Sequence, residues 1–246
     1  MSEQRNVPKK NPRGNDAVMK VIARIHTDLP TKFGVPRQSG LVEALKAVII
    51  FEPGYRSPEA VRGLEEFSHI WLLWQFSEAV RETWSPTVRP PRLGGDKRMG
   101  VFATRSPFRP NALGLSCVRL DSIALDPDFG PVLHVSGADL MDRTPIFDIK
   151  PYLPYTDCRP EASGGFTDTH KFEQLEVNFP DDLLQQIPEH QRAALIGILT
   201  QDPRPSYIED PDRLFGFEFG SFDVKFTVQG NFLTVNKLEP LNKKKE

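Results

Sequence analysis

Short runs of β-branched and aromatic residues, each bounded by Pro, Gly or Asp, dominate the first two thirds of this 246-residue chain. Such runs favour extended strands, because branched and aromatic side chains pack well on a pleated surface, whereas the bounding residues favour turns. The runs are Val18–Thr27, Ala44–Phe51, His69–Phe76, Met99–Thr104, Leu115–Ile123, Val132–Ala138 and Pro145–Ile149. Seven short strands predict a β-barrel or a β-sandwich.

Helical signals are sparse. One helix is expected at Ser57–Glu66, where Ser57 can cap the first turn and the following Pro suits it. In the last third, Phe172–Phe179 alternates like a strand, and Asp181–Thr200 has helical spacing apart from a break at Pro188. The runs Phe217–Val228 and Phe232–Leu238 are then typical of a hairpin.

The composition changes after Tyr155, where small and turn-forming residues predict a linker. A chain of this length suits a body of about 150 residues with a smaller appendage. We therefore expect a mainly β protein in which a strand-rich domain is followed by a small α+β C-terminal domain. The expected boundaries are a disordered basic tail at 1–17, the strand-rich domain at 18–160, a linker at 161–170 and the C-terminal domain at 171–246.

Composition indicates a cytoplasmic protein. No apolar run approaches the roughly 20 residues of a membrane-spanning helix, and the polar N-terminal segment does not resemble a secretory signal. Cys117 and Cys158 are the two cysteines of the chain, and they form no C-x-x-C pair. Neither a disulfide framework nor a thiolate metal site is therefore indicated.

A basic loop runs from Arg89 to Asn111, with six basic residues and one acidic residue in a chain whose net charge is −2. Pro and Gly alternate with these cations. Proline fixes backbone angles and glycine permits close approach, so a loop of this kind can hold Arg side chains and N–H groups in set positions. The loop predicts a site for a polyanion; the alternative is a solvated loop with scattered Arg residues.

Familiar catalytic motifs are missing from the chain: no dinucleotide fingerprint, P-loop, nucleophile elbow or zinc-protease signature occurs. Polar residues at predicted strand ends remain as site candidates, because binding residues tend to lie on loops of a rigid scaffold. They are His69, Arg105, Asp139 and Asp142. Each also has a structural interpretation, for example a partly buried His or an Asp that turns the chain.

Several long motifs occur in a fixed order along the chain. They are Lys32–Gln38, Gly63–Trp71, Arg89–Asn111, Asp142–Pro145, Asp148–Tyr152, Gln201–Tyr207 and Leu238–Pro240. Together they resemble the TrmO family of S-adenosylmethionine-dependent tRNA methyltransferases, from about Val18 to Pro240. The resemblance implies methylation of N6 of threonylcarbamoyl-adenosine at position 37, in the anticodon loop of threonine tRNAs. It also implies a single-sheet β-barrel that binds the cofactor, and a homodimer.

The resemblance also implies which residues form the site. Those expected to bind S-adenosylmethionine are Pro36, Arg37, Gln38, His69, Ile70, Arg105, Leu115, Asp139, Leu140, Met141 and Asp142. Either Arg37 or Arg105 can grip the carboxylate of the cofactor, and aspartate can balance its positive charges. Leu115 and Ile70 are expected to enclose the adenine.

The acceptor side of the expected site comes from the C-terminal motif and the basic loop. Asp202 and Tyr207 are catalytic candidates for removing the N6 proton, with His69 as a further possibility. The residues expected to contact tRNA are Arg89, Arg92, Lys97, Arg98, Arg109 and Arg204, and Phe33 or Phe108 is expected beside the unstacked base. No metal is required, because the leaving group of the cofactor is already activated.

Two positions depart from the family pattern: Ala112 stands where a second Pro often follows Asn111, and Arg143 replaces the usual Gly. A non-Gly residue carries strain at Arg143 if that position has a positive φ. Two alternative functions stay open. One is a non-catalytic cofactor- or RNA-binding module, and the other is a metal-dependent hydrolase that uses His69, Asp139, Asp142 and Asp148.

Overall fold

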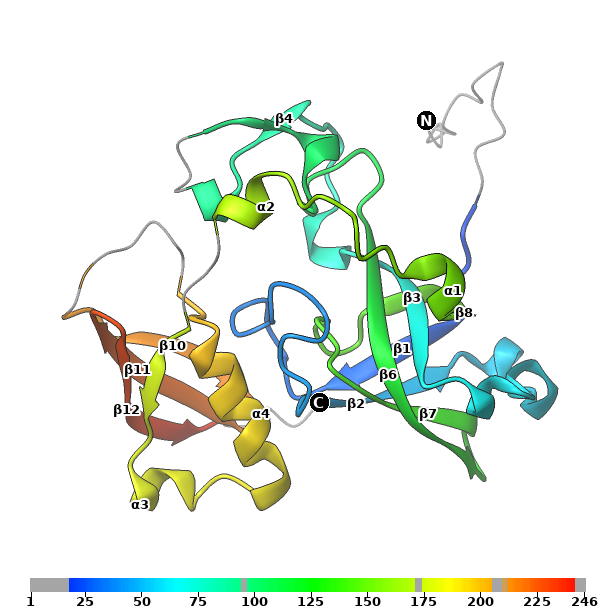
Figure 1. Cartoon of the computed structure of the whole chain (residues 1–246). Coiled ribbons are helices and arrows are strands. Elements are labelled where there is room, and N and C mark those ends of the chain that lie inside the picture. Colours follow the sequence, from blue (N-terminus) through cyan, green and yellow to red (C-terminus); the bar gives the residue numbers. More distant parts are fainter. Residues whose placement is uncertain (1–17, 94–96, 171–173, 205–209, 211, 242–246) are drawn as a thin grey trace, which may run out of the picture.

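The computed structural model describes residues 18–93, 97–170, 174–204, 210 and 212–241. A closed six-stranded barrel forms the first domain, in the order β1-β2-β7-β6-β3-β8 (Figure 1). Its strands are β1 (Ala23–Thr27), β2 (Lys46–Phe51), β3 (His69–Gln75), β6 (Leu113–Asp126), β7 (Gly130–Ser136) and β8 (Pro145–Pro151). All six pairings are antiparallel. The prediction of a mainly β fold with a barrel is confirmed, while the basic tail expected at 1–17 lies outside the described residues.

Alternating burial along β3 shows how sequence sets the barrel wall. Ile70, Leu72 and Trp74 point into the barrel core, while the residues between them are half-buried on the outer face. Gly114 on β6 lies directly opposite Trp74. A Cβ atom at Gly114 would be 2.2 Å from Cε2 of Trp74, so the indole ring occupies the space of the missing side chain.

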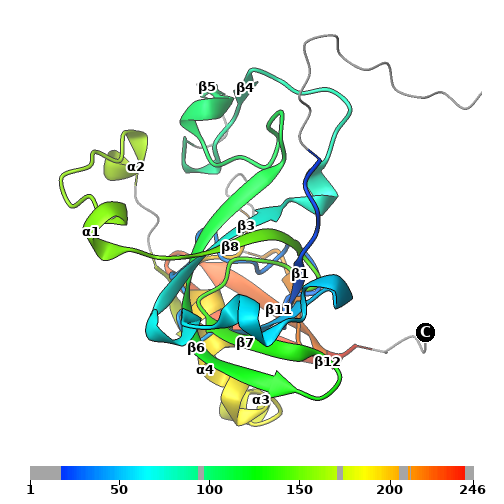
Figure 2. The same ribbon diagram turned by 90° about the vertical axis from the view of Figure 1, so that its right-hand side faces the viewer.

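Two elements expected in this domain are absent from the described barrel. The strand predicted at Met99–Thr104 is confirmed only at β5 (Met99–Gly100), which pairs with β4 (Thr87–Val88) in a separate two-stranded sheet. A single 3-10 turn follows at Val101–Ala103, where the hydroxyl of Thr104 donates to the carbonyl of Val101 over 2.9 Å and closes the turn. We call residues 77–112, which include this sheet, the lobe. The lobe stands away from the barrel at the upper end of the view in Figure 2.

The helix expected at Ser57–Glu66 was wrong. Two 3-10 turns occupy this segment, at Pro58–Val61 and Leu64–Glu66. Gly63 between them has a φ of 82°, which is incompatible with a continuous right-handed helix. Ser57 makes no capping hydrogen bond.

The C-terminal domain is a four-stranded sheet with helices on one side. The sheet order is β10-β11-β12-β9. Its elements are β9 (Glu176–Asn178), α3 (Asp181–Leu184), α4 (Glu189–Thr200), β10 (Phe215–Phe219), β11 (Phe222–Gln229) and β12 (Phe232–Pro240). The expected break at Pro188 is confirmed, and β11 and β12 form the expected hairpin. The run Phe217–Val228 is not one strand, because a turn with Gly220 at a φ of 57° divides it.

Between the two domains, the chain forms α1 (Pro154–Asp157) and α2 (Phe166–Thr169). The second of these short helices lies within the segment expected as a linker. Among the described residues, no helix combines the length and apolar character needed to cross a membrane.

The loop between β1 and β2 joins the two domains through a shared core. Leu29, Val42 and Leu45 are buried in the same hydrophobic cluster as α4 and the C-terminal sheet. At Gly197 of α4, a Cβ atom would lie 2.8 Å from Cγ1 of Val42, so the helix approaches the loop closely. Gly220 also donates its N–H to the carbonyl of Asp28 over 2.7 Å. The barrel domain and the C-terminal domain therefore pack as one body at this loop.

Gly114→Ala should lower the free energy of unfolding by about 1–3 kcal/mol, because Trp74 must move to admit the methyl group. Urea unfolding followed by circular dichroism measures this loss. Gly54→Ala is the matched control, since nothing lies within 4 Å of its added Cβ. Equal losses in the two variants would contradict the packing seen at Trp74.

Candidate functional site

Two motifs that are far apart in the sequence meet where the loop after β1 contacts the end of α4. A cavity of about 100 Å³ lies at this contact. It is lined by Lys32, Phe33, Gly34, Val35, Pro36, Arg37, Ile198, Gln201, Asp202, Pro203 and Arg204. The Lys32–Gln38 and Gln201–Tyr207 motifs thus contribute to one site, with Tyr207 itself outside the described residues.

Arg37 fastens the loop to the C-terminal end of α4. Its guanidinium donates to the carbonyl of Gln201 over 2.9 Å and to the carbonyl of Asp202 over 3.0 Å. The last carbonyls of a helix have no partner within the helix and carry partial negative charge. A cation from the other domain therefore caps α4, and the position of each motif depends on the other.

Asp202 follows this helix end in the left-handed conformation, with a φ of 50°. Glycine is the usual residue at such a position. Here the Asp202 carboxylate instead accepts two hydrogen bonds from Arg204, at 2.8 Å from Nε and 2.9 Å from Nη2. Because both oxygens are used and both side chains are mostly buried, this pair fixes the orientation of the Arg204 guanidinium.

Arg105 connects the lobe to the same loop. Its Nη1 donates to Oε1 of Gln38, and Nε2 of Gln38 donates to the carbonyl of Arg37. Arg109 donates to the carbonyl of Thr104 over 3.0 Å and so supports the backbone just before Arg105. Arg105 is itself exposed, which leaves its charge available to an anionic group.

Asp139 is a largely buried carboxylate near this arginine. The hydroxyl of Ser116 donates to it over 2.5 Å and in turn accepts from the indole N–H of Trp74 over 2.9 Å. Burial raises the pKa of Asp139, against the opposing effects of the Ser116 hydrogen bond and of the Arg105 charge. Neither Ser116 nor Trp74 was expected at the site, because strand alternation alone marks both as inward-facing core residues.

The remaining residues expected around the cofactor are distributed over other parts of the barrel. Ile70 and Leu140 are fully buried in its core. Leu115 is 57% exposed on β6 and points away from its neighbour Ser116. His69 lies on the outer face of β3, with its ring 6.3 Å from that of Tyr152. The assignment of these four residues to the cofactor site stays a prediction.

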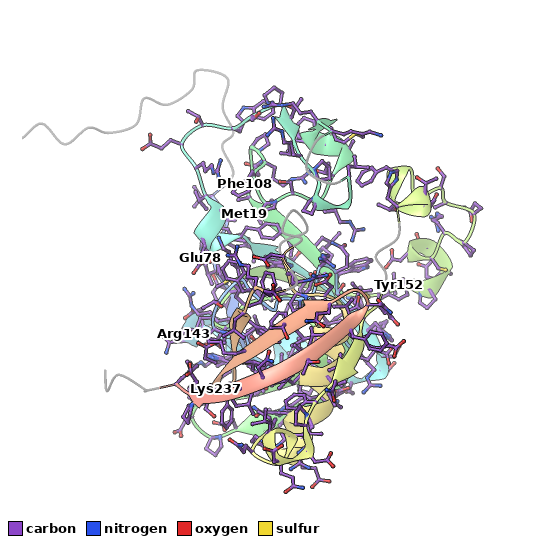
Figure 3. The ribbon with its side chains drawn as sticks, turned by 90° about the vertical axis from the view of Figure 1, so that its left-hand side faces the viewer. Met19, Glu78, Phe108, Arg143, Tyr152 and Lys237 are labelled. Carbon is purple, nitrogen blue, oxygen red and sulfur yellow. The ribbon has the colours of Figure 1, made fainter. Side chains whose placement is uncertain are left out.

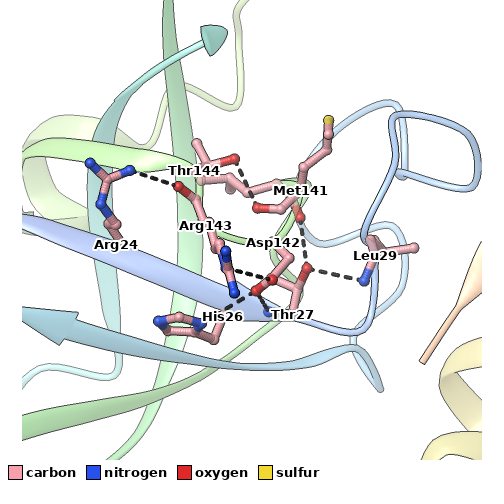
Figure 4. A network of polar contacts seen from close by, with 9 residues as sticks. Arg24, His26, Thr27, Leu29, Met141, Asp142, Arg143 and Thr144 are labelled. Carbon is pink, nitrogen blue, oxygen red and sulfur yellow. Dashed lines mark hydrogen bonds and ion pairs between the residues drawn. The ribbon is translucent and has the colours of Figure 1, made fainter. Parts of the chain in front are cut away.

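Asp142 and Met141 lie beside the end of β1 (Figure 4). The Asp142 carboxylate accepts from the backbone N–H of Thr27 over 3.1 Å and lies 3.4 Å from Nδ1 of His26. Arg143 has a φ of 61°, so this departure from the family pattern does place a non-Gly residue in the left-handed region. Arg24 donates to the carbonyl of Arg143 over 3.2 Å and supports this loop conformation.

The basic residues expected to contact tRNA lie mainly on the lobe. Arg89, Lys97 and Arg98 are exposed there, and Arg98 donates to the hydroxyl of Thr87 over 2.8 Å. The side chain of Arg92 lies outside what the structure describes. Arg109 is half-buried and holds the backbone, so its observed role is structural. Phe108 lies on the lobe and is separated from Tyr152 and from Lys237 of the C-terminal sheet (Figure 3).

The residues of the metal-hydrolase alternative have separate partners. His69 contacts Ser68 at 2.9 Å, and Asp148 pairs with Lys150 at 3.1 Å, whereas the carboxylates of Asp139 and Asp142 have the partners described above. Within the described residues, no group of three or more His, Cys, Asp or Glu side chains is arranged to hold a metal ion. The described geometry therefore gives this alternative no support.

Arg37→Met should lower the free energy of unfolding by about 2 kcal/mol or more, because two carbonyls at the end of α4 lose a charged donor while the apolar stem is kept. Chemical unfolding measures the loss. Arg62→Met is the control, because Arg62 is 74% exposed and its surface pair with Glu59 should contribute about 0–1 kcal/mol. Similar losses in both variants would contradict the capping role.

Asp139→Asn should stabilise the protein relative to the wild type increasingly as pH rises from 3.8, the ordinary pKa of Asp, through the raised pKa of Asp139. Because burial raises this pKa, the folded state retains the proton to a higher pH than the unfolded state, and the wild type loses stability between the two pKa values. Asparagine keeps an acceptor for Ser116 without titrating. Unfolding curves at several pH values measure the difference, and a pH-independent difference would contradict a raised pKa.

Comparison with known proteins relates both domains to one family. Residues 24–158 match the tRNA-methyltransferase O N-terminal domain, and residues 172–241 match the TrmO C-terminal domain. The chain is 39% identical over 227 residues to the tRNA (adenine(37)-N6)-methyltransferase of Escherichia coli, covering 89% of this chain and 96% of that relative. A relative of the same name from Eikenella corrodens is 43% identical over 164 residues, or 66% of this chain and 92% of the relative.

Structural comparison gives the same result. The crystal structure of TrmO from Pseudomonas aeruginosa superimposes with a TM-score of 0.72 at 31% identity, covering 91% of this chain and 98% of that one. A probable S-adenosyl-L-methionine-binding protein of Pyrococcus abyssi is 34% identical over 155 residues, or 62% of this chain and 78% of that protein. The matches span both the barrel and the C-terminal domain, and the chain belongs to the tRNA-methyltransferase O family.

Proposed function

We propose that the protein transfers a methyl group from S-adenosylmethionine to N6 of adenosine 37 in the anticodon loop of tRNA. The observation that carries this proposal is the meeting of the Lys32–Gln38 loop, Gln201–Arg204 and Arg105 at one site, in a chain of this family. The expected substrate is the threonylcarbamoyl form of the base in threonine tRNAs. The names of the Escherichia coli and Eikenella corrodens relatives support the reaction at position 37.

The charges at the site fit the cofactor. S-adenosylmethionine supplies a methyl group that is already activated on a sulfonium, and its amino-acid part carries a carboxylate and an ammonium. The exposed guanidinium of Arg105 suits the carboxylate, because Arg37 is already engaged by two backbone carbonyls. The nearby Asp139 carboxylate suits a positive group. Pro36 and Gln38 would form the adjoining wall.

The residues of this chain would act mainly by positioning. In the proposed reaction, N6 of the base would accept the methyl group of the bound cofactor, which would leave as the neutral thioether, and N6 would lose its proton. Alignment of these atoms and exclusion of water can supply much of the rate. Asp202 would orient Arg204, whose guanidinium would bind the threonyl carboxylate or a phosphate. Tyr207 remains our candidate for accepting the proton.

The exposed cations of the lobe support recognition of an anticodon stem-loop. Arg89, Lys97 and Arg98 would contact phosphates and make the affinity salt-dependent. We further propose that the protein acts as a homodimer in the cytoplasm, with the domain boundaries predicted from the sequence. We keep Leu115 and His69, on the outer face of the barrel, as members of the proposed cofactor site.

The test is transfer of a labelled methyl group from S-adenosylmethionine to purified threonine tRNA, with and without the threonylcarbamoyl modification. We expect label in the modified tRNA alone. Label in both forms would support the reaction and would show that the threonylcarbamoyl modification is not required in the substrate. Binding of cofactor and tRNA without transfer to either form would favour the alternative, a non-catalytic binding module.

Arg105→Ala should reduce cofactor affinity strongly and leave the fold intact, because its side chain is exposed on the lobe. Titration calorimetry with S-adenosylmethionine measures the affinity, and Arg62→Ala serves as a surface control. Unchanged affinity in the Arg105 variant would show that another residue holds the carboxylate.

A further inference from the structure

Aromatic side chains that have no role in the site described above are exposed on the lobe. Trp84 is 52% exposed and Phe102 is 73% exposed. Their ring centroids lie 6.1 Å apart, with an interplanar angle of 36°. Large rings are usually covered in a folded protein, so a neighbouring exposed pair points to a binding surface.

The segments that carry these two rings are held by the backbone. Val101, next to Phe102, is 1% exposed, and its N–H donates to the carbonyl of Pro86 over 2.9 Å. The adjoining strands β4 and β5 pair with each other. The two rings are therefore presented by a buried anchor and a short sheet, which lowers the entropy that a ligand must overcome on binding.

The composition of the lobe that carries the rings suits a polyanion. The lobe, residues 77–112, contains seven Arg or Lys residues and three Asp or Glu residues. Arg81 lies over the ring of Phe108, with its guanidinium carbon 3.9 Å from the ring centroid. Exposed aromatic rings among cations are the combination that binds single-stranded nucleic acid, because bases stack on the rings while phosphates approach the cations.

The position of the pair relates it to the site. Phe102 lies three residues before Arg105, and three extended residues span at most about 11 Å. A nucleotide close to the target base can therefore reach the rings while the target base is at the site.

We propose that Trp84 and Phe102 form a stacking surface for an unstacked base of the anticodon loop that flanks the methylated adenosine. This inference rests on the proposed function and adds a determinant of RNA binding to it. Stacking requires an unpaired base and is independent of the phosphate contacts. The two rings should therefore contribute to affinity for a loop and contribute little to affinity for a continuous duplex.

The test measures binding of an anticodon stem-loop RNA, and separately of a duplex RNA of equal length, to Trp84→Ala and Phe102→Ala. For the stem-loop, each variant should have a dissociation constant about 5- to 150-fold higher than the wild type. The slope of affinity against salt concentration should stay unchanged, because no phosphate contact is removed. Duplex affinity and cofactor affinity should also stay unchanged.

Two controls separate stacking from general effects. Phe102→Tyr keeps a ring and should bind the stem-loop like the wild type. Phe232→Ala removes a ring that is 57% exposed on β12 of the C-terminal sheet, and it should leave the affinity unchanged. The inference is overturned if Phe102→Tyr loses as much affinity as Phe102→Ala, or if both alanine variants bind the stem-loop like the wild type.

A second copy of this chain is the rival occupant of the surface. Sedimentation measures the oligomeric state of each variant, and a change in that state with unaltered RNA affinity per site would overturn the inference. Its failure is distinguishable from failure of the proposed function. If the wild type transfers the methyl group and both alanine variants bind the stem-loop normally, only the stacking surface is refuted. If the wild type transfers no methyl group, the proposed function is refuted.

Discussion

The hydrophobic core shared by the loop after β1 and the C-terminal domain determines the geometry of the candidate site. Leu29, Val42 and Leu45 belong to the barrel domain in sequence, yet they are buried against α4 and the C-terminal sheet. Without this burial, a long loop would have no means of offsetting its conformational entropy. The contact places Lys32–Gln38 beside Gln201–Arg204, so the site exists only where the two domains meet.

Within that contact, the charges are held by partners of the protein itself. Arg37 binds the carbonyls at the end of α4, and Arg204 binds Asp202. Asp139 accepts from Ser116, which accepts from Trp74. Groups whose orientation is fixed before the substrate arrives need little reorganisation during the reaction, which is the advantage of a preorganised site. Arg105 also has a partner, Gln38, but its side chain is exposed and can reach a ligand.

Sequence patterns predicted the elements whose signals are local. Alternation of apolar residues identified the barrel strands, and Pro188 marked the start of α4. Local signals failed at Met99–Thr104, where a hydroxyl closes a turn, and at Ser57–Glu66, where Gly63 has a positive φ. In both segments a single backbone conformation overrides the average propensity of the surrounding residues.

The sequence by itself determined the strand-rich architecture, the family resemblance and most of the motifs that meet at the site, because these depend on residue types and their order. Tertiary structure alone decided which of those residues are neighbours. It linked Ser116 on β6 to Asp139, placed Arg105 beside Gln38, and joined Arg37 to the end of α4. Such contacts depend on how strands close and domains pack, and no local pattern encodes the distance between residues far apart in the chain.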